Sequence, residues 1–291
     1  MNPNESNSDI LPQESSTSPV APAEAAPIAP PKKKTTRFKL TVAYDGTAYH
    51  GWQIQARHVT VQQVIEQALA DITRQTFVRV QGSSRTDQGV HAHGQVAHVD
   101  LERRMAPDKL MRALNSRLPA AIRILKVVRK KAYFHARRST LSKEYRYFVW
   151  NDEQILPDKR LYMAHVCPPL DLNVLRGAVK RFVGQHDFVA FSANPSREVK
   201  STVRTISDFT VTRKGKEFCF RVRGNGFLYR QVRSMIGFLL RVGAGGEPPE
   251  AITELLDTCA PRTERVASAP ARGLFLWKIW YRGKRSNVRE V

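Results

Sequence analysis

Apolar residues in the first folded part of the chain alternate between the spacing of a strand and that of a helix. They recur at every second position over 38–44, and at helical spacing over 61–72, after a capping-box pattern formed by Thr60 and Gln63. Two more strands (77–81 and 95–101), a helix (107–117) and a strand (122–128) follow. The resulting order, β-α-β-β-α-β, is that of a split βαβ unit, a largely antiparallel sheet beneath two helices.

The second part of the chain repeats this pattern less regularly. A strand over 145–150 is expected to extend the first unit, and the second part itself is expected to contain elements over 172–182 (helix), 206–212 and 217–223 (strands), 231–242 and 249–257 (helices) and 274–281 (strand). We therefore expect an α+β fold of two ferredoxin-like (split βαβ) halves, with a mixed, largely antiparallel central sheet and helices on one side. The expected divisions are a leader and basic linker (1–36), an N-terminal half (37–150), a linker region (151–170), a C-terminal half (171–283) and a basic tail (284–291).

The first 31 residues differ in composition from the rest of the chain. They hold seven of the 17 prolines, four of the 26 acidic residues and no Lys or Arg, a composition that predicts disorder. They lack the apolar segment of a secretory signal and the arginines of a transit peptide. All 47 basic residues thus lie in 32–291 with the other 22 acidic ones, a formal net charge of +25. This charge predicts a nucleic acid as partner, although a merely basic surface is the alternative.

The composition argues against membranes, metals and cofactors. A membrane-binding amphipathic helix, a lipidation site and a run of ~18 apolar residues are all missing. Three cysteines are widely separated and lack CxxC spacing, which indicates reduced thiols and a cytoplasmic location: Cys167, Cys219 and Cys259. Three histidines lie close together but without a cysteine pair, so no metal site is expected: His91, His93 and His98. The glycines at 243–246 lack the Lys-Ser/Thr of a P-loop, so ATP use is not indicated.

A polar segment between two predicted strands contains a single acid. Asp87 follows Arg85 and precedes Gly89, and Gly89 and Gly94 permit the tight or positive-φ backbone that aims a loop side chain outward. This pattern is typical of a loop that presents a catalytic carboxylate. Because Ser, Asp and Gly are common in turns, a structural turn is the alternative.

Two other segments carry groups suited to RNA. Trp52 and Gln53 lie in a loop rich in rings and amides, which could stack on or hydrogen bond to bases, or else pack as core. A basic run over 134–147 leads into an aromatic strand, where cations could neutralise phosphates and a tyrosine could stack on an extruded base. Alternation puts Tyr145 on the face opposite Arg146, and an edge strand with solvated arginines is the plain alternative.

Arg233 lies within the first turn of the helix predicted over 231–242. A cation near a helix N-terminus opposes the helix dipole and needs compensation. We expect Arg233 to pair with Asp87 and to hold that acid ionised and oriented. Gly224 and Gly226 just before this helix are only weak evidence for a phosphate-binding loop.

Taken in order, these segments resemble the TruA-type tRNA pseudouridine synthases over about residues 37–282. The motifs are YDG and GWQxQ (44–55), SRTDxGVHAxGQVA (84–97), LNxxLP (114–119), FHAR (134–137), KEYRY (143–147), GxHDF (184–188), FLYRQVR (227–233) and APAxGL (269–274). One departure is the pair Ser83 and Ser84 before Arg85, where a Gly or Ala beside the arginine would be expected.

The resemblance implies isomerisation of uridine to pseudouridine in the anticodon stem-loop of tRNA, at tRNA positions 38–40, by a homodimer that grips the tRNA jointly. By this match Asp87 is the catalytic aspartate, Tyr145 stacks on the target base and Arg233 pairs with the aspartate. Arg85 matches a residue that helps to displace the base. The remaining positions expected to contact the substrate are Trp52, Gln53, His91, Arg137, Lys143, Arg146, Phe227, Tyr229 and Leu274.

The implied chemistry needs no cofactor, because moving the ribose bond from N1 to C5 of uracil is redox neutral and releases nothing. Asp87 could add to C1′ or abstract the 2′ proton to form a glycal. Two other classes of protein remain as alternatives. A non-catalytic RNA-binding protein would make no pseudouridine, and an aspartate-dependent nucleic-acid hydrolase would need a cluster of metal-binding acids.

Overall fold

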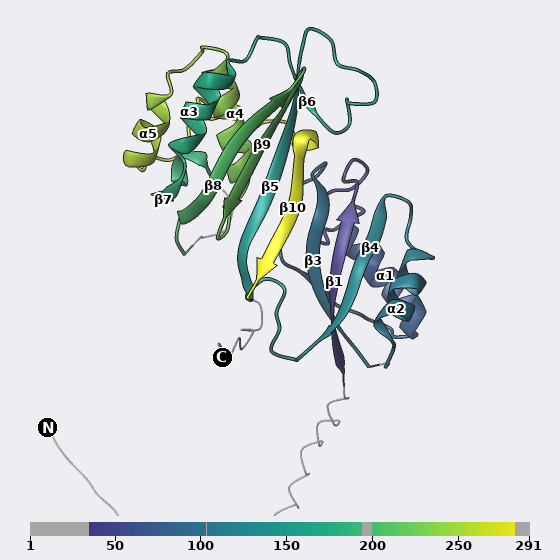
Figure 1. The fold of residues 1–291 in the computed structure, drawn as a ribbon. Coiled ribbons are helices and arrows are strands. Elements are labelled where there is room, and N and C mark those ends of the chain that lie inside the picture. The colour runs from purple at the N-terminus through teal and green to yellow at the C-terminus, as the bar shows by residue number, and fades with distance from the viewer. Residues whose placement is uncertain (1–34, 103, 194–199, 283–291) are drawn as a thin grey trace, which may run out of the picture. The chain divides into compact units, whose positions relative to one another are not determined.

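A computed structural model describes residues 35–102, 104–193 and 200–282 (Figure 1). The predicted leader and the basic tail lie outside these residues, apart from the last two residues of the linker. Within the described residues the strands form one continuous ten-stranded sheet, with the path β4-β1-β3-β10-β5-β9-β8-β7 and with β2 and β6 beside it. None of the described helices has the length and apolar character needed to cross a bilayer.

The N-terminal half contains β1 (Thr36–Tyr44), α1 (Val61–Thr73), β2 (Val80–Gly82), β3 (His91–Leu101), α2 (Pro107–Asn115) and β4 (Ile122–Lys130). β1 pairs antiparallel with β3 and β4, and β2 pairs antiparallel with β3, so the spatial order is β4-β1-β3-β2. α1 begins after Thr60, whose hydroxyl accepts the Gln63 amide at 3.4 Å as the N-cap. β2 is three residues long, shorter than the predicted strand.

The C-terminal half repeats that order. It contains β5 (Thr140–Asn151), α3 (Leu172–Lys180), β8 (Val203–Lys214), β9 (Glu217–Gly224), α4 (Gln231–Gly243), α5 (Glu250–Asp257) and β10 (Leu274–Tyr281). The strand that was expected to extend the first unit is thus the first strand of this half, because β5 pairs with β9 and β10. Its antiparallel pairs give β10-β5-β9-β8, the counterpart of β4-β1-β3-β2. Two short strands are additional to the prediction, β6 (Ala164–Val166) beside β5 and β7 (Gly184–Asp187) beside β8. The expected α+β fold of two split βαβ units is confirmed.

The two halves join along β3. β2 pairs with β3 as far as Gly82, opposite Ala97, and β10 then runs parallel to the start of β3, with Leu276 opposite Ala92. The loop over 83–90 therefore leaves β2 and enters β3 at the junction between the halves. This position brings the Asp87 loop close to elements of both halves.

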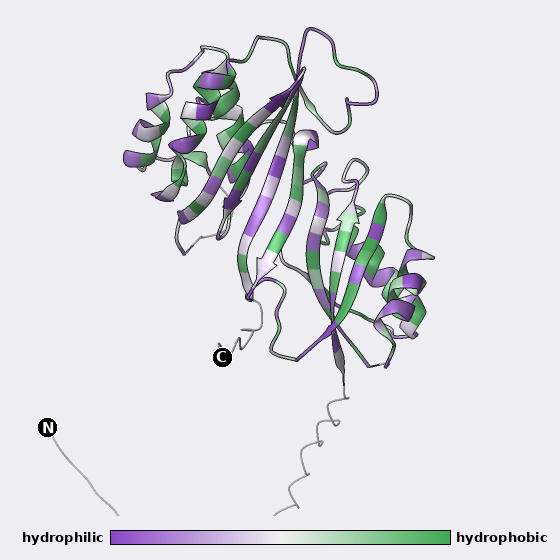
Figure 2. Ribbon diagram, in the orientation of Figure 1, coloured by the Kyte–Doolittle hydropathy of each residue, from purple (hydrophilic) through white to green (hydrophobic). Residues whose placement is uncertain are grey.

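One face of the sheet is apolar and continuous through both halves. Successive register pairs place these buried residues side by side: Tyr44, Ala92, Leu276, Tyr145, Val222 and Phe209. α2 packs on β4 and α3 packs on β8, at the two ends of the sheet (Figure 1). The opposite face carries Phe275, Arg146 and Arg221 in register, and the strands accordingly show mixed hydropathy along their length (Figure 2).

Candidate active site

The Asp87 loop rests on the segment that follows β1. Gly51 has φ +84°, and a Cβ there would lie 2.4 Å from the Thr86 carbonyl oxygen. The Trp52 amide donates to that same oxygen at 3.1 Å. A Cβ on Gly46 would lie 2.1 Å from the Val90 oxygen at the other end of the loop. The YDG and GWQ motifs thus support the loop by close backbone approach.

Trp52 belongs to the core. Its side chain is 2% exposed, and a Cβ on Gly82 would lie 2.3 Å from the indole Nε1. The tilted contact with the Tyr44 ring, at 6.0 Å between centroids, adds to this packing. Of the two roles considered for Trp52, the structure shows packing in the core. It gives no support to direct contact with a substrate.

Asp87 pairs with arginines of the other half. Its side chain is 20% exposed, and Oδ2 accepts a hydrogen bond from Arg233 Nη1 at 3.0 Å. Arg230 Nε lies 3.9 Å from the same oxygen. Asp87 is thus a partly accessible carboxylate beside two guanidinium groups, and it supplies the charge compensation that Arg233 needs at the start of α4.

Arg233 is itself anchored by the segment before β10. Its Nε donates to the Ala269 carbonyl at 2.8 Å, and its own carbonyl accepts the Ala269 amide at 2.9 Å. The neighbouring Pro270 carbonyl accepts a hydrogen bond from the Tyr147 hydroxyl at 2.8 Å. A Cβ on Gly237 of α4 would lie 2.0 Å from the Ala267 oxygen, so the helix needs glycine there to approach this segment. The APAxGL motif therefore fixes the arginine that meets Asp87.

Tyr145 lies on the helix-covered face of β5, next to the loop. Its side chain is 6% exposed, its hydroxyl lies 2.7 Å from the Ser84 hydroxyl, and its ring meets Phe227 edge-on at 5.3 Å. Burial raises the pKa of Tyr145 to about 12, the Ser84 hydrogen bond opposes that rise, and the Asp87 charge adds to it. The phenol therefore keeps its proton at neutral pH.

Lys143 lies on the same face of β5, two residues before Tyr145. Its Nζ donates to the Ser83 carbonyl at 2.8 Å. Burial lowers the pKa of Lys143 to about 8, and the nearby charge of Arg137 adds to the effect. The ammonium is thus held at the base of the Asp87 loop, and it loses its proton far more readily than an exposed lysine.

Two predicted substrate contacts lie on the opposite face of the sheet. The Arg146 guanidinium stacks over Trp277 at 4.0 Å and pairs with Glu144 at 2.9 Å. His91 is buried against Phe275, with ring centroids 4.5 Å apart, and its Nδ1 accepts the Gly46 amide at 3.1 Å. The structure does not bring Arg146 or His91 to Asp87, and the geometry gives no support to a substrate-binding role for either residue.

The other predicted positions differ in access. Arg85, two residues before Asp87, and Arg137 are exposed, as is Tyr229, whose side chain is 45% exposed. Gln53 and Phe227 are half-buried. Leu274 is buried and lies opposite Tyr147 in the register of β10 with β5.

Three features of the site had little signal in the sequence. Ser84 and Arg230 contact Tyr145 and Asp87, but neither was selected as a site residue. The signal for Ser84 was its departure from the expected Gly or Ala. Gly89 has φ +74°, as expected, whereas Gly94 is needed for space, because a Cβ there would lie 2.4 Å from the Trp277 oxygen.

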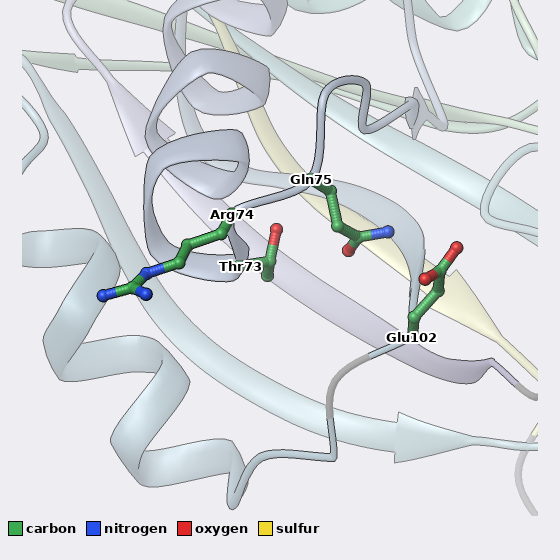
Figure 3. A pocket seen from close by; sticks show the side chains of 4 residues that line it. All are labelled: Thr73, Arg74, Gln75 and Glu102. Carbon is green, nitrogen blue, oxygen red and sulfur yellow. The ribbon is translucent and has the colours of Figure 1, made fainter.

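A pocket elsewhere on the N-terminal half is formed where α1 and β3 end. Its lining comprises Thr73, Arg74, Gln75 and Glu102 (Figure 3), none of which is a predicted site residue. In the part of the chain that the structure describes, no three or more His, Cys, Asp or Glu side chains are grouped so as to hold a metal ion.

Known proteins are similar to this chain over most of its length. The family model described as tRNA pseudouridine synthase matches residues 40–137 and 178–282. The tRNA pseudouridine synthase A of Maridesulfovibrio salexigens is 43% identical over 247 residues, 84% of this chain and 90% of that protein. The protein of the same name from Halalkalibacterium halodurans is 43% identical over 240 residues, 82% of this chain and 90% of that one. A solved Cbf5-Nop10-Gar1 complex is similar only at a TM-score of 0.32 and 14% identity, over 80% of this chain and 56% of that one.

Proposed function

The chain belongs to the tRNA pseudouridine synthase family, and we propose that Asp87 carries out its reaction, the isomerisation of uridine to pseudouridine in tRNA. The observation that supports this role is the Asp87–Arg233 ion pair, formed between the two halves with the carboxylate partly open to solvent. An ionised, oriented carboxylate is the group that nucleophilic addition or proton abstraction requires. The resemblance inferred from the motifs is thus confirmed at the level of the family.

Asp87 has two routes to the product. In one, the carboxylate adds to C1′ as the bond to N1 breaks, and the freed uracil rotates before C5 attacks C1′ and displaces the carboxylate. In the other, Asp87 takes the 2′ proton as the bond to N1 breaks, which forms a glycal, and the proton returns to C2′ as C5 bonds to C1′. In both routes C5 then loses its proton and N1 gains one. Both routes leave the atoms and oxidation states of the nucleoside unchanged, and both need the uracil to stay in the site.

Tyr145 is suited to retain the uracil. Its ring lies beside the Asp87 loop with its hydroxyl held by Ser84, and its phenol stays protonated. Because its side chain is only 6% exposed, a base that stacks on it has to meet the small open part of the ring or displace a neighbour such as Phe227. The exposed Arg85, in the same loop as Asp87, would help to displace the base, and the exposed Arg230 would hold a phosphate of the extruded nucleotide.

We further propose the anticodon stem-loop, at tRNA positions 38–40, as the place of modification, and a cytoplasmic homodimer as the working form. The motif resemblance supports these finer assignments, and the basic composition agrees with an RNA substrate. Sedimentation equilibrium of the purified protein would test the assembly: a mass of one chain at working concentration contradicts the dimer.

The test of the reaction compares Asp87→Ala with the unaltered protein. Pseudouridines are mapped at single-nucleotide resolution in tRNA from cells that lack the protein, before and after incubation with each variant. We expect new pseudouridines only with the unaltered protein, a loss of more than ~10³-fold in rate with Asp87→Ala, and tRNA affinity within a few-fold. Asp71→Ala, on the exposed side of α1, is the matched control. Activity that survives in Asp87→Ala contradicts the catalytic role of Asp87. Pseudouridine formed outside tRNA positions 38–40 contradicts only the proposed place of modification.

A further inference from the structure

We infer that Ser84 is a positioning residue, which sets the Tyr145 ring relative to the Asp87 loop through a hydrogen bond between their hydroxyls. The inference rests on the proposed function, because it acts through Tyr145. Its starting observation is the contact of 2.7 Å between Ser84 Oγ and Tyr145 Oη, with both residues buried. Ser84 is three residues before Asp87, so the contact links β5 directly to the loop that carries the acid.

Ser84 is itself held by a side chain. Gln95 of β3 is fully buried, and its amide bonds both backbone groups of Ser84: Oε1 accepts the Ser84 N–H at 3.2 Å, and Nε2 donates to the Ser84 carbonyl at 2.7 Å. This double contact fixes the backbone from which Oγ projects. A hydroxyl on so constrained a backbone can define the position of its partner.

Tyr145 also makes an aromatic contact through its ring. The edge contact with Phe227 restrains the plane of the ring, but Phe227 is half-buried in the loop between β9 and α4. Ser84 supplies the fixed point at the phenol end. The loop is then fixed on two sides, to α4 by the Asp87–Arg233 pair and to β5 by the Ser84–Tyr145 pair.

The residue type matters at this position. A glycine or alanine, the residue expected beside the arginine of this motif, would leave the Tyr145 hydroxyl without the Ser84 partner in a buried environment. The adjacent Ser83 cannot replace it, because its hydroxyl lies 2.8 Å from the Thr140 hydroxyl. The Tyr145 ring would then lose its fixed point at the phenol end, which predicts a slower chemical step and unaltered docking of the tRNA.

The test is a double-mutant cycle of Ser84→Ala and Tyr145→Phe, measured by single-turnover pseudouridine formation and by tRNA binding. We expect Ser84→Ala to lower the rate by about tenfold, the size of one hydrogen bond, with tRNA affinity unchanged. In the Tyr145→Phe background the same change should have no further effect. Ser83→Ala is the matched control, a hydroxyl of the same loop directed at Thr140, and it should keep the full rate.

A spectroscopic measurement completes the test. Because Ser84 Oγ lies 2.7 Å from the Tyr145 hydroxyl, Ser84→Ala should shift the Tyr145 Cζ resonance at neutral pH, and Ser83→Ala should leave it in place. An unchanged rate in Ser84→Ala, or an equal loss with and without the phenol, overturns the inference. If Tyr145→Phe keeps full activity while Asp87→Ala is inactive, the inference fails with the role of Tyr145, but the role of Asp87 stands.

Discussion

The two halves share one topology but differ in the connection between their second and third strands. In the C-terminal half β8 and β9 are long, and only Gly215 and Lys216 join them in a tight turn. In the N-terminal half the equivalent β2 has three residues, and the connection to β3 is the eight-residue loop over 83–90 that carries Asp87. The same fold therefore supports a plain hairpin in one half and a candidate catalytic loop in the other.

The difference follows from how the halves join. Because β2 stops at Gly82, the first residues of β3 are left for β10 to pair with. The shortened strand thus creates both the junction between the halves and the loop that crosses it. The second half then contributes Arg233, Arg230 and Tyr145 to a loop that belongs to the first half. The chemistry is placed by loop length and register, which the shared topology alone does not determine.

The cross-half ion pair gives the largest expected effect after Asp87 itself. Arg233→Gln should lower the rate of pseudouridine formation by roughly 10²-fold, because it removes the charge that orients Asp87 and the hydrogen bond to Ala269. Arg230→Gln is the control: its Nε is 3.9 Å from Asp87, so we expect a smaller loss. Single-turnover kinetics with saturating protein would measure both. Equal losses would mean that net positive charge, and not the Arg233 contact, is what the site needs.

The two connections can be compared directly by replacing one glycine at each of them. Gly51→Ala places a Cβ 2.4 Å from the Thr86 oxygen at φ +84°, so the Asp87 loop has to shift, and we expect about a tenfold lower rate. Gly215→Ala also has a positive φ, +59°, but has no atom within 4 Å of the new Cβ. It should cost roughly 1–2 kcal/mol of folding stability and leave the rate unchanged. A reduced rate in Gly215→Ala would show that the plain hairpin also takes part in catalysis.

Most of the fold could be predicted from local patterns in the sequence. β10 begins and ends where the alternation predicts, and α1 begins at its predicted cap, because each period is long enough to specify one buried face. β6 and β7 have three and four residues, too few to establish a period. The parallel pairing of β10 with β3 joins residues almost 200 positions apart in the sequence, and no local signal encodes it.

The site was harder to predict, because the surroundings of each side chain depend on tertiary contacts. The Asp87–Arg233 pair was predicted because an arginine at the start of α4 needs a compensating charge. In the structure Arg233 Nη1 lies 3.0 Å from Asp87 Oδ2. Alternation correctly separated Tyr145 from Arg146, but the pattern does not say which face the loop crosses. Trp52 and His91 were expected to contact the substrate, with core packing left open for Trp52, whereas the structure buries both rings. The contact between Ser84 and Tyr145 could be identified only from the structure, which places β5 beside the loop.

The smallest expected effect is a difference between the two halves in how their stability depends on pH. His98 of β3, opposite Gln81 of β2, is 3% exposed, and its Nδ1 accepts the Ala136 amide at 3.2 Å. Burial, with the charges of Arg37 and His135, lowers the pKa of His98 to about 4.

The folded state therefore binds fewer protons than the unfolded state between pH 6.5 and 4. The stabilisation from neutral His98 is fully present above pH 6.5 and is lost as the pH falls towards 4, by roughly 1–3 kcal/mol. Hydrogen exchange should show β2 and β3 losing protection in this range before β8 and β9. His98→Asn keeps an acceptor near the Nδ1 position and should remove the part of the difference that His98 causes, and the part due to His91 and His93, whose pKa values burial also lowers, should remain. If both halves lose protection together in both proteins, the sheet unfolds as one unit, and the contrast between the halves concerns function alone.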